Sequence, residues 1–319
     1  MKFLKNKKIL ITGGTGFIGS RLINELTKAE CKIYLMVRQN NKLVNKIKNK
    51  KIRVLKGNLV DINFWKKNIR EKDFLIHLAS DESKFGSKID VVQNFNINVK
   101  SIFLALFCAQ QLNKKIKIIS IGSENQLGIA KKIPVNEEIN DNPVTIFGIN
   151  KLIAEKYSAF FKKNFNIKIV NLRLSNVYGP SGLSSNFFKV SMNKMIKNIS
   201  GGKIFLYKNK NSIRDFVYID DVINAIILSM KKINKLKSVF YYIGSGKGYS
   251  LKKISEMIMK IIVEIYPNKE IITENITKKI SKFDKRNFVA NYKKFQQATG
   301  WTPKTSLKKG ISITIAKIT

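Results

Sequence analysis

The chain has 319 residues, 44% of them hydrophobic and 10% aromatic, which suffices for one large α/β domain and a smaller lobe. It carries 60 Lys and Arg against 21 Asp and Glu, a formal net charge of +39. Such a charge attracts phosphorylated ligands and raises the question of a nucleic-acid partner. The lysines, however, are scattered along the whole chain, and no basic tail or aromatic-basic module concentrates them. We therefore interpret them as a solvated surface and expect no nucleic-acid partner.

The N-terminal residues and the cysteines indicate a cytoplasmic protein. The start, MKFLKNKKIL, is basic but lacks the apolar core and cleavage site of a signal peptide. No apolar run reaches the roughly 18 residues of a membrane span, so we expect no membrane partner. Cys31 and Cys108 fall in or beside predicted core elements and indicate small buried groups in a reducing compartment.

Short apolar runs alternate with helical patterns through the first half of the chain. Strands are predicted at 7–13, 32–38, 51–57, 73–79, 115–123 and 167–175. Helices are predicted at 17–29, 91–112 and 145–163. Near-continuous apolar strands separated by helices are typical of a parallel sheet covered on both faces. Successive βαβ units of this kind predict a doubly wound α/β fold of the Rossmann type.

The pattern changes after about residue 176, where loops lengthen and pieces such as GGKIFLYKN stand between helices. We expect a dinucleotide-binding domain over 1–175 and a smaller, mixed α/β substrate-binding lobe over 176–319. The boundary is soft, because chain from either part can return to the other.

A glycine loop, TGGTGFIGS, follows the first predicted strand and opens the first predicted helix. Gly13, Gly16 and Gly19 stand three apart. A strand that turns tightly into a helix points backbone N–H groups and the helix dipole at one place, which favours a pyrophosphate. Glycine lets the chain turn and lets phosphate and sheet approach closely. The position of the loop between strand and helix favours dinucleotide binding over an ordinary glycine turn.

The ends of the second and third strands bear on the choice of dinucleotide. An acidic residue after the second strand would bind the ribose 2′-hydroxyl of NAD, whereas an arginine suits the 2′-phosphate of NADP. The second strand ends at Val37-Arg38, with Lys42 nearby. The expected cofactor is therefore NAD(P), with NADP favoured, although Arg38 could also be one more surface arginine of a very basic chain. Asn58 and Leu59, after the third strand, are placed to reach the adenine.

Several longer motifs occur in one order along the chain. GGTGFIG, IHLAS, the segment at Ser123 and the helix with Lys151 are followed by NLRLSNVYGP at 171–180 and IRDFVYIDDV at 213–222. Together they resemble the extended short-chain dehydrogenase/reductase family, and within it the nucleotide-sugar epimerases, dehydratases and reductases. The resemblance runs nearly end to end, because YYIGSGKGYSLKKI and GWTPKTSLKKGI are similar to the family's C-terminal segments.

The resemblance implies roles for individual residues and a nucleotide sugar as the substrate. Lys151 would hold the nicotinamide ribose, and Ser123 matches the catalytic Ser or Thr that bonds the sugar 4-oxygen. Asn176 and Arg214 match groups that hold the nucleotide diphosphate of the substrate. The residues that would surround the dinucleotide are Gly13, Gly16, Phe17, Ile18, Gly19, Leu78, Ala79, Ser80 and Asn98.

The chemistry of Arg214 also supports a phosphate-binding role independently of the resemblance, since a guanidinium group binds phosphate through two parallel hydrogen bonds. Its alternative role is structural, as an ion pair with Asp215 or Asp220.

The stretch TIFGINKLIAEKY, at 145–157, departs from the family pattern at one position. The family has a tyrosine at position 147, four residues before Lys151 and therefore on the same helix face. The resemblance implies that its phenol, with a pKa lowered from about 10 by the ammonium, exchanges a proton with the sugar hydroxyl. Phe147 keeps the ring and removes the acid. Because general acid–base groups typically contribute about 10²–10⁴-fold, we expect slowed hydride transfer with binding retained.

Three explanations of Phe147 stay open. It could be a deliberate Tyr-to-Phe change made to trap a complex. The natural protein could use another proton route, through Ser123, Glu124 or water. Alternatively, the chain could be a catalytically weak homologue that binds dinucleotide and nucleotide sugar.

The residues after Ser123 reduce the number of reactions that the family resemblance allows. The 4,6-dehydratases of the family carry an acid two positions after the Ser or Thr, and this acid removes the proton at sugar C5. Here that position is Asn125, an amide that cannot act as a base. We therefore expect an epimerase or a 4-keto reductase that transfers hydride at sugar C4. Glu124 would be polar lining or a substitute acid.

Three further expectations concern a histidine, metals and assembly. His77, the one histidine, is expected to be a strand residue satisfied by nearby backbone. One histidine and two distant cysteines make no metal site. Related proteins pair through two long helices, so the helices at 91–112 and 145–163 lead us to expect a homodimer.

Overall fold

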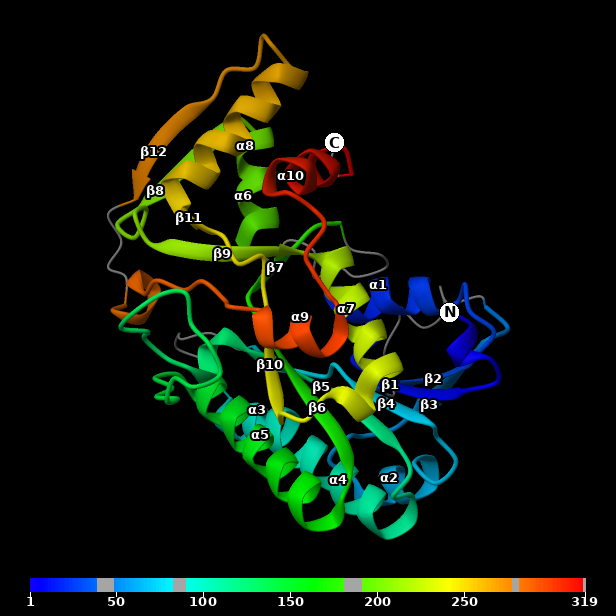
Figure 1. Cartoon of the computed structure of the whole chain (residues 1–319). Helices are drawn as coiled ribbons and strands as arrows, with labels where there is room; N and C mark the ends of the chain where they lie inside the picture. Colours follow the sequence, from blue (N-terminus) through cyan, green and yellow to red (C-terminus); the bar gives the residue numbers. More distant parts are fainter. Residues whose placement is uncertain (39–48, 83–89, 181–190, 277–280, 318–319) are drawn as a thin grey trace.

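A computed structural model describes residues 1–38, 49–82, 90–180, 191–276 and 281–317 (Figure 1). Its centre is a seven-stranded sheet with the order β10-β6-β5-β4-β1-β2-β3, in which every neighbouring pair is parallel. Its strands are β1 (Lys8–Thr12), β2 (Lys32–Val37), β3 (Ile52–Lys56), β4 (Phe74–His77), β5 (Lys117–Ser123), β6 (Lys168–Leu174) and β10 (Phe240–Ile243). The doubly wound α/β fold is confirmed.

Helices cover both faces of this sheet (Figure 1). α1 and α7 pack together on one face, whereas α4 packs against both α2 and α5 on the other. A π-helical turn, Asn96–Lys100, joins α3 to α4. The helices are α1 (Phe17–Leu26), α2 (Ile62–Asn68), α3 (Val91–Phe95), α4 (Ser101–Leu112), α5 (Ile146–Phe165) and α7 (Ile219–Lys232).

The strands are apolar on both faces because both faces are buried. On β1, Ile9 and Ile11 join the apolar cluster that contains α1 and α7, whereas Leu10 joins the cluster beneath α4. Successive strand residues point to opposite faces, so a strand between two helical layers needs apolar side chains at every position. Cys31 and Cys108 are free thiols buried in these clusters, as predicted.

The C-terminal part of the chain builds two smaller sheets, seen at the top of Figure 1. One has the order β11-β9-β7, and the other is the parallel pair β12-β8. Its elements are β7 (Asn176–Tyr178), β8 (Lys203–Tyr207), β9 (Ile213–Tyr218), β11 (Gly248–Ser250), β12 (Ile272–Ile276), α6 (Ser191–Ser200), α8 (Leu251–Ile265), α9 (Lys293–Thr299) and α10 (Leu307–Ile315). Between them, α7 and β10 return to the large sheet. The domain boundary at 175 and 176 stays a prediction.

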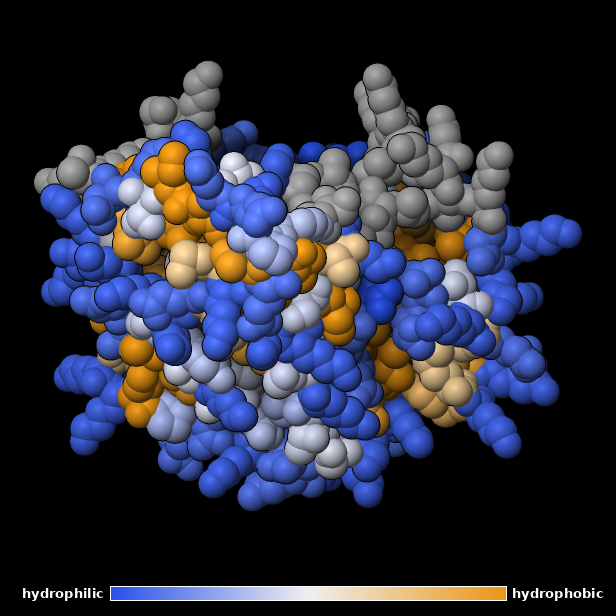
Figure 2. All heavy atoms as spheres, turned by 90° about the horizontal axis from the view of Figure 1, so that it is seen from above, coloured by the Kyte–Doolittle hydropathy of each residue, from blue (hydrophilic) through white to orange (hydrophobic). Residues whose placement is uncertain are grey.

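Within the described ranges, one helical stretch, Val91–Leu112, is long and apolar enough to cross a membrane by length and composition alone. The stretch is not an unbroken apolar run, since it includes Asn94, Asn98 and Lys100. Its most apolar window is 56% buried inside the protein, as is typical of a core helix. Hydrophilic side chains are spread widely over the face seen in Figure 2.

Candidate active site

The carboxyl ends of the parallel strands form one edge of the large sheet. β1 ends at Thr12, β4 at His77 and β5 at Ser123. Ligands of doubly wound folds bind in the crevice outside this edge. The candidate residues of the sequence analysis lie at or beyond it.

The glycine loop packs directly against the segment that follows β4. Gly13 has a φ of +68°, and a Cβ added there would lie 2.6 Å from the Leu78 carbonyl carbon and the Ala79 nitrogen. A Cβ on Gly19 would lie 2.3 Å from the carbonyl oxygen of Gly13. A side chain at either position would occupy the space between the glycine loop and the segment that follows β4, which we call the glycine cradle. The loop therefore requires glycine at both positions.

The cradle opens onto a helix N-terminus. Gly16 is the N-cap of α1, and the half-buried Phe17 and Ile18 form its first turn. N–H groups of a first turn point out of the helix and favour negative charge. The loop therefore fits the pyrophosphate of a nicotinamide dinucleotide, which would supply or accept hydride when bound.

Two candidates for adenosine contacts are exposed where they were expected. Arg38 directly follows β2, and Asn58 follows β3 with its side-chain oxygen accepting the Val60 N–H at 3.2 Å. Leu59 differs, because its side chain is only 5% exposed and packs in the core near α2. Lys42 lies outside the described residues.

Asn98 holds the segment beyond β4 in place. Its side-chain oxygen accepts from the Ser80 hydroxyl at 3.0 Å and from the Asp81 N–H at 3.2 Å. Its amide nitrogen donates to the Asp81 carbonyl at 2.9 Å and to Asn94 at 3.0 Å. The side chain is 2% exposed and sits in the π-helical turn, so its polar atoms fix the backbone beside the glycine cradle.

The start of α5 lies against the turn that follows Ser123. Thr145 caps the helix by accepting the Gly148 N–H at 2.9 Å. A Cβ on Gly148 would lie 2.3 Å from the carbonyl oxygen of Asn125. This close approach brings the half-buried Phe147, in the first turn of α5, to the carboxyl end of β5.

Lys151 is a buried ammonium on the same helix. Its Nζ donates to the Ile121 carbonyl of β5 at 2.9 Å and lies 5.8 Å from the centroid of the Phe147 ring. Burial lowers the pKa of Lys151 to about 8, against a small opposite effect of Glu82. Both protonation states are therefore accessible near neutral pH.

Ser123 is oriented by its neighbours in a short helical turn, Glu124–Gln126. Its hydroxyl accepts the Asn125 N–H at 3.3 Å, and its own N–H donates to Gln126 Oε1 at 2.8 Å. Gln126 Nε2 in turn donates to Glu155 Oε2 at 2.9 Å. The Glu155 carboxylate can only accept a hydrogen bond, so it must face the amide nitrogen of Gln126. The amide oxygen of Gln126 is therefore the atom that faces Ser123.

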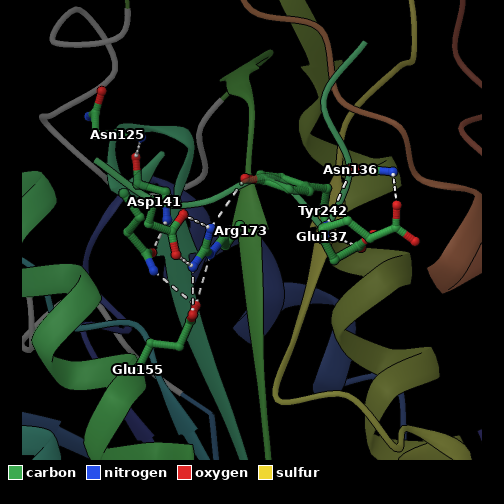
Figure 3. A network of polar contacts seen from close by, with 10 residues as sticks. Asn125, Asn136, Glu137, Asp141, Glu155, Arg173 and Tyr242 are labelled. Atoms are coloured by element: carbon green, nitrogen blue, oxygen red, sulfur yellow. Dashed lines mark hydrogen bonds and ion pairs between the residues drawn. The ribbon is translucent and has the colours of Figure 1, made fainter. Parts of the chain in front are cut away.

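Behind Gln126 lies a buried ion network centred on Arg173 (Figure 3). The guanidinium donates to Asp141 at 2.6 and 2.7 Å and to Glu155 at 2.6 and 2.9 Å. It also donates to the Tyr242 hydroxyl at 3.2 Å and lies 3.6 Å from the centroid of the Phe240 ring. Burial opposes the charge of Arg173, but the two carboxylates raise its pKa above the ordinary value. The network joins α5, β6 and β10 behind the site.

Glu124 is tied into an ion pair that the sequence analysis missed. Its Oε1 accepts from Arg286 at 2.5 Å, and its Oε2 accepts from the Asn176 amide at 3.2 Å. Arg286 also donates to the Asn125 side-chain oxygen at 3.0 Å. These contacts favour Glu124 as polar lining and weigh against a substitute acid. Arg286 gave no sequence signal, since it is one of 60 basic residues and stands in no motif.

Arg214 makes neither of the ion pairs considered for it. Its guanidinium donates to the carbonyls of Ile213 at 3.1 Å and Asp284 at 2.7 Å, and to the carbonyl of Arg286. Burial and then the charge of Arg286 lower its pKa to about 10.

The two acids proposed as partners are engaged elsewhere. Asp220 accepts from Arg21 at 2.6 and 2.9 Å. Asp215 accepts from Ser245 at 2.8 and 2.6 Å and from the backbone of Gly246 and Ala290. The ion-pair alternative for Arg214 with either of these acids was therefore wrong, and its described hydrogen-bond partners are carbonyls.

His77 is satisfied by two hydroxyls and not by backbone, which corrects the prediction. Thr12 Oγ1 lies 2.9 Å from Nδ1, and Ser101 Oγ lies 3.1 Å from Nε2. Burial, with a smaller effect of Lys151, lowers the His77 pKa to about 3. Among the residues that the structure describes, no group of three or more His, Cys, Asp or Glu side chains could hold a metal ion.

A parallel sheet with a glycine cradle at its carboxyl edge, and Ser123 and Lys151 beyond it, defines an extended short-chain dehydrogenase/reductase. The sequence profile of the NAD dependent epimerase/dehydratase family matches residues 9–244, and the chain belongs to that family. It is 28% identical over 270 residues to the UDP-glucose 4-epimerase of Lactobacillus helveticus, covering 80% of this chain and 81% of that protein.

Solved structures of the same fold cover nearly the whole chain. A UDP-glucose 4-epimerase from Thermotoga maritima, solved with UDP-glucose, gives a TM-score of 0.83 at 23% identity over 98% of each chain. A UDP-glucuronic acid 4-epimerase from Bacillus cereus, in complex with NAD, gives a TM-score of 0.80 at 23% identity over 98% of this chain and 96% of that one. At these identities the likeness shows the shared fold.

Proposed function

We propose that this chain is an NAD(P)-dependent nucleotide-sugar epimerase or 4-keto reductase that transfers hydride at sugar C4. The observation that carries the proposal is the position of Lys151, which donates to Ile121 of β5 and lies 5.8 Å from the centroid of the Phe147 ring, while Ser123 ends the same strand. Ser123 would hold the sugar 4-oxygen, and Lys151 would hold the nicotinamide ribose.

The diphosphate of the substrate would bind Asn176 and Arg214. Arg214 supports this role, because its described hydrogen-bond partners are carbonyls, which leave its charge free to attract an anion. Arg286 lowers the pKa of Arg214 by its positive charge, although Glu124, which accepts from Arg286, partly offsets that effect. A diphosphate would add negative charge beside these two guanidinium groups.

Elimination is disfavoured by the residues after Ser123. Asn125 cannot remove the proton at sugar C5, and its side-chain oxygen already accepts from Arg286. Glu124 is held by the same arginine and is only 4% exposed. Epimerisation and 4-keto reduction need no such base and are the reactions that remain.

NADP is the proposed dinucleotide, because the exposed Arg38 stands where the 2′-phosphate would lie. The proposal predicts tighter binding of NADP⁺ than of NAD⁺, and an Arg38→Ser variant should lose that preference. Equal affinities in the wild type would contradict it. We place this chemistry in the cytoplasm, with no nucleic-acid or membrane partner.

A homodimer is proposed to form through α4 and α5, with a second copy of the chain covering their outer face. Phe107, Tyr157 and Phe160 are 36%, 39% and 53% exposed on these helices. A groove of about 330 Å³ between the helices is lined by Phe103, Phe107, Gln110, Gln111, Tyr157, Phe160, Phe161 and Phe165. Clustered exposed aromatic side chains mark a protein interface more often than free surface.

A catalytically weak homologue that binds dinucleotide and nucleotide sugar is the second candidate, favoured by the absence of a phenol at position 147. The test compares the wild type with Phe147→Tyr by following NAD(P)H absorbance with a panel of nucleotide sugars and their 4-keto forms. Epimer products are followed by chromatography. Phe3→Tyr, at a half-buried position outside the candidate site and the proposed dimer interface, is the matched control.

Three outcomes separate the candidates. A gain of about 10²-fold or more in Phe147→Tyr alone means that the site is intact and lacks only its acid. Turnover by the wild type without such a gain means that another group carries the proton. If neither protein turns over while both bind dinucleotide, the binding homologue is the better description.

A further inference from the structure

We propose that Lys151 is itself the proton donor and acceptor of this chain, in place of the phenol that position 147 lacks. The proposal rests on the proposed function and deepens it, because it concerns how the proton moves in that site. The role would be additional to holding the nicotinamide ribose.

The first support is the placement of the ammonium group. Lys151 is 8% exposed, and its one hydrogen-bond partner among the described residues is the Ile121 carbonyl at 2.9 Å. An ammonium has three N–H donors, so two remain for ligands. The group also lies 5.8 Å from the centroid of the Phe147 ring, on the helix face where the family's acid would stand.

The second support is that the rival groups near the end of β5 are engaged. Glu124 is held by Arg286 at 2.5 Å and by Asn176 at 3.2 Å. Ser123 has a hydroxyl that needs a neighbouring base before it can take or give a proton at neutral pH. His77 is 3% exposed and bonded at both ring nitrogens by hydroxyls.

The third support is the electrostatic environment of Lys151, which allows the group to gain and lose a proton near neutral pH. Burial brings its pKa to about 8, within reach of the pH at which a general acid works best. The charged or titratable groups that face it are Glu82, which raises its pKa, and His77, which stays neutral because burial lowers the His77 pKa to about 3. A cationic nicotinamide ring nearby would lower the Lys151 pKa further.

The proton balance is simple in both directions. Oxidation of a sugar carbinol would break the C–H bond of the carbon that bears the hydroxyl, with its hydride accepted by the bound dinucleotide, and the O–H bond would lose its proton to the neutral Lys151 amine. In the reduction of a keto sugar the carbon would receive a hydride, and the Lys151 ammonium would give its proton to the oxygen. No further oxidant or reductant is needed.

The first experiment measures the protons that the protein releases when it binds the dinucleotide, and it does not depend on turnover. The heat of binding of NAD⁺ or NADP⁺ is measured at pH 7 in two buffers with different ionisation enthalpies, and the difference counts the protons released. If the bound cation lowers the Lys151 pKa from about 8 to about 7, the wild type releases about 0.4 proton. Lys151→Arg keeps the charge but cannot deprotonate, so it should release none.

Lys162→Arg is the matched control. Lys162 lies on the same helix, and burial also lowers its pKa to about 8, but it donates to the carbonyls of Ile169, Leu236 and Ser238. Its variant should release the same number of protons as the wild type. Equal release by Lys151→Arg, or no release by the wild type, overturns the proposal. Failure to bind either dinucleotide overturns the proposed function instead.

The second experiment places Lys151→Arg in two backgrounds. In the wild-type background the variant should lose about 10²–10⁴-fold in kcat, because it removes the acid. In the Phe147→Tyr background the phenol carries the proton, so the loss should be at least about 10-fold smaller. Equal losses in the two backgrounds would mean that Lys151 only positions the cofactor, and the proposal would fail.

Discussion

Replacing Arg173 tests how much the buried ion network that joins α5, β6 and β10 stabilises the fold. In Arg173→Met the guanidinium is removed while a side chain of similar length still fills the space beside Phe240. Asp141 and Glu155 each lose two hydrogen bonds of 2.6 to 2.9 Å. Their side chains are only 14% and 6% exposed, so water cannot replace the lost donors.

The size of the effect follows from burial. Removing one partner of a buried ion pair costs about 3–5 kcal/mol, because the remaining charge is left uncompensated. Here one substitution leaves two carboxylates without their cation. We therefore expect the free energy of unfolding to fall by about 4 kcal/mol at pH 8, a large part of the 5–15 kcal/mol typical of folded proteins.

The assay is urea unfolding followed by tryptophan fluorescence, with Arg21→Met as the control. Arg21 also binds a carboxylate through two hydrogen bonds, but its side chain and that of Asp220 are 33% and 44% exposed. Exposed pairs contribute about 0–1 kcal/mol, so the control should lose little. An Arg173→Met deficit below about 1 kcal/mol at pH 8 would refute the reasoning.

Three other predictions follow from the described geometry. Gly13→Ala should lower dinucleotide affinity at least about 10-fold, because its Cβ would lie 2.6 Å from the backbone of Leu78; a titration with unchanged affinity would contradict the cradle. His77 has a folded-state pKa of about 3, below its unfolded value of 6.5, so it contributes stability above pH 6.5 that is lost as pH falls. Between pH 8 and pH 5 this loss amounts to about 2 kcal/mol in urea unfolding, and His77→Gln should remove that share of the slope. Phe160→Glu should convert the proposed dimer to monomer in sedimentation, whereas Ile272→Glu, at a 61% exposed position on β12, should leave it a dimer.

Local pattern was enough to predict most of the large sheet. Six of its strands, and the helices predicted at 17–29, 91–112 and 145–163, follow from apolar runs and helical spacing, whereas the seven-residue α2 was not predicted. The strand β10 was not assigned to that sheet. It is four residues long, and its pairing with β6 depends on contacts between segments far apart in the chain.

The candidate site was predictable only where a residue stands in a motif. Gly13 and Lys151 could be named because loop position and helix spacing restrict what they can do. Arg286 and Gln126 could not, since their importance comes from partners that the fold brings to them. Arg286 and Glu124 are separated by 162 residues in the sequence, and no local motif at either position predicts their ion pair.

β10 is synthesised well after β6, its neighbour in the large sheet, and this order affects folding during translation. β6 ends at Leu174, whereas β10 begins at Phe240, 66 residues later. At a synthesis rate of roughly 5–20 residues per second, the edge of β6 is open for roughly 3–13 seconds on each ribosome. An unpaired strand edge can pair with another chain, so neighbouring nascent chains on one messenger would be at risk of mispairing. Slow translation between residues 174 and 240 should therefore lower the soluble yield more than the same delay placed after residue 243.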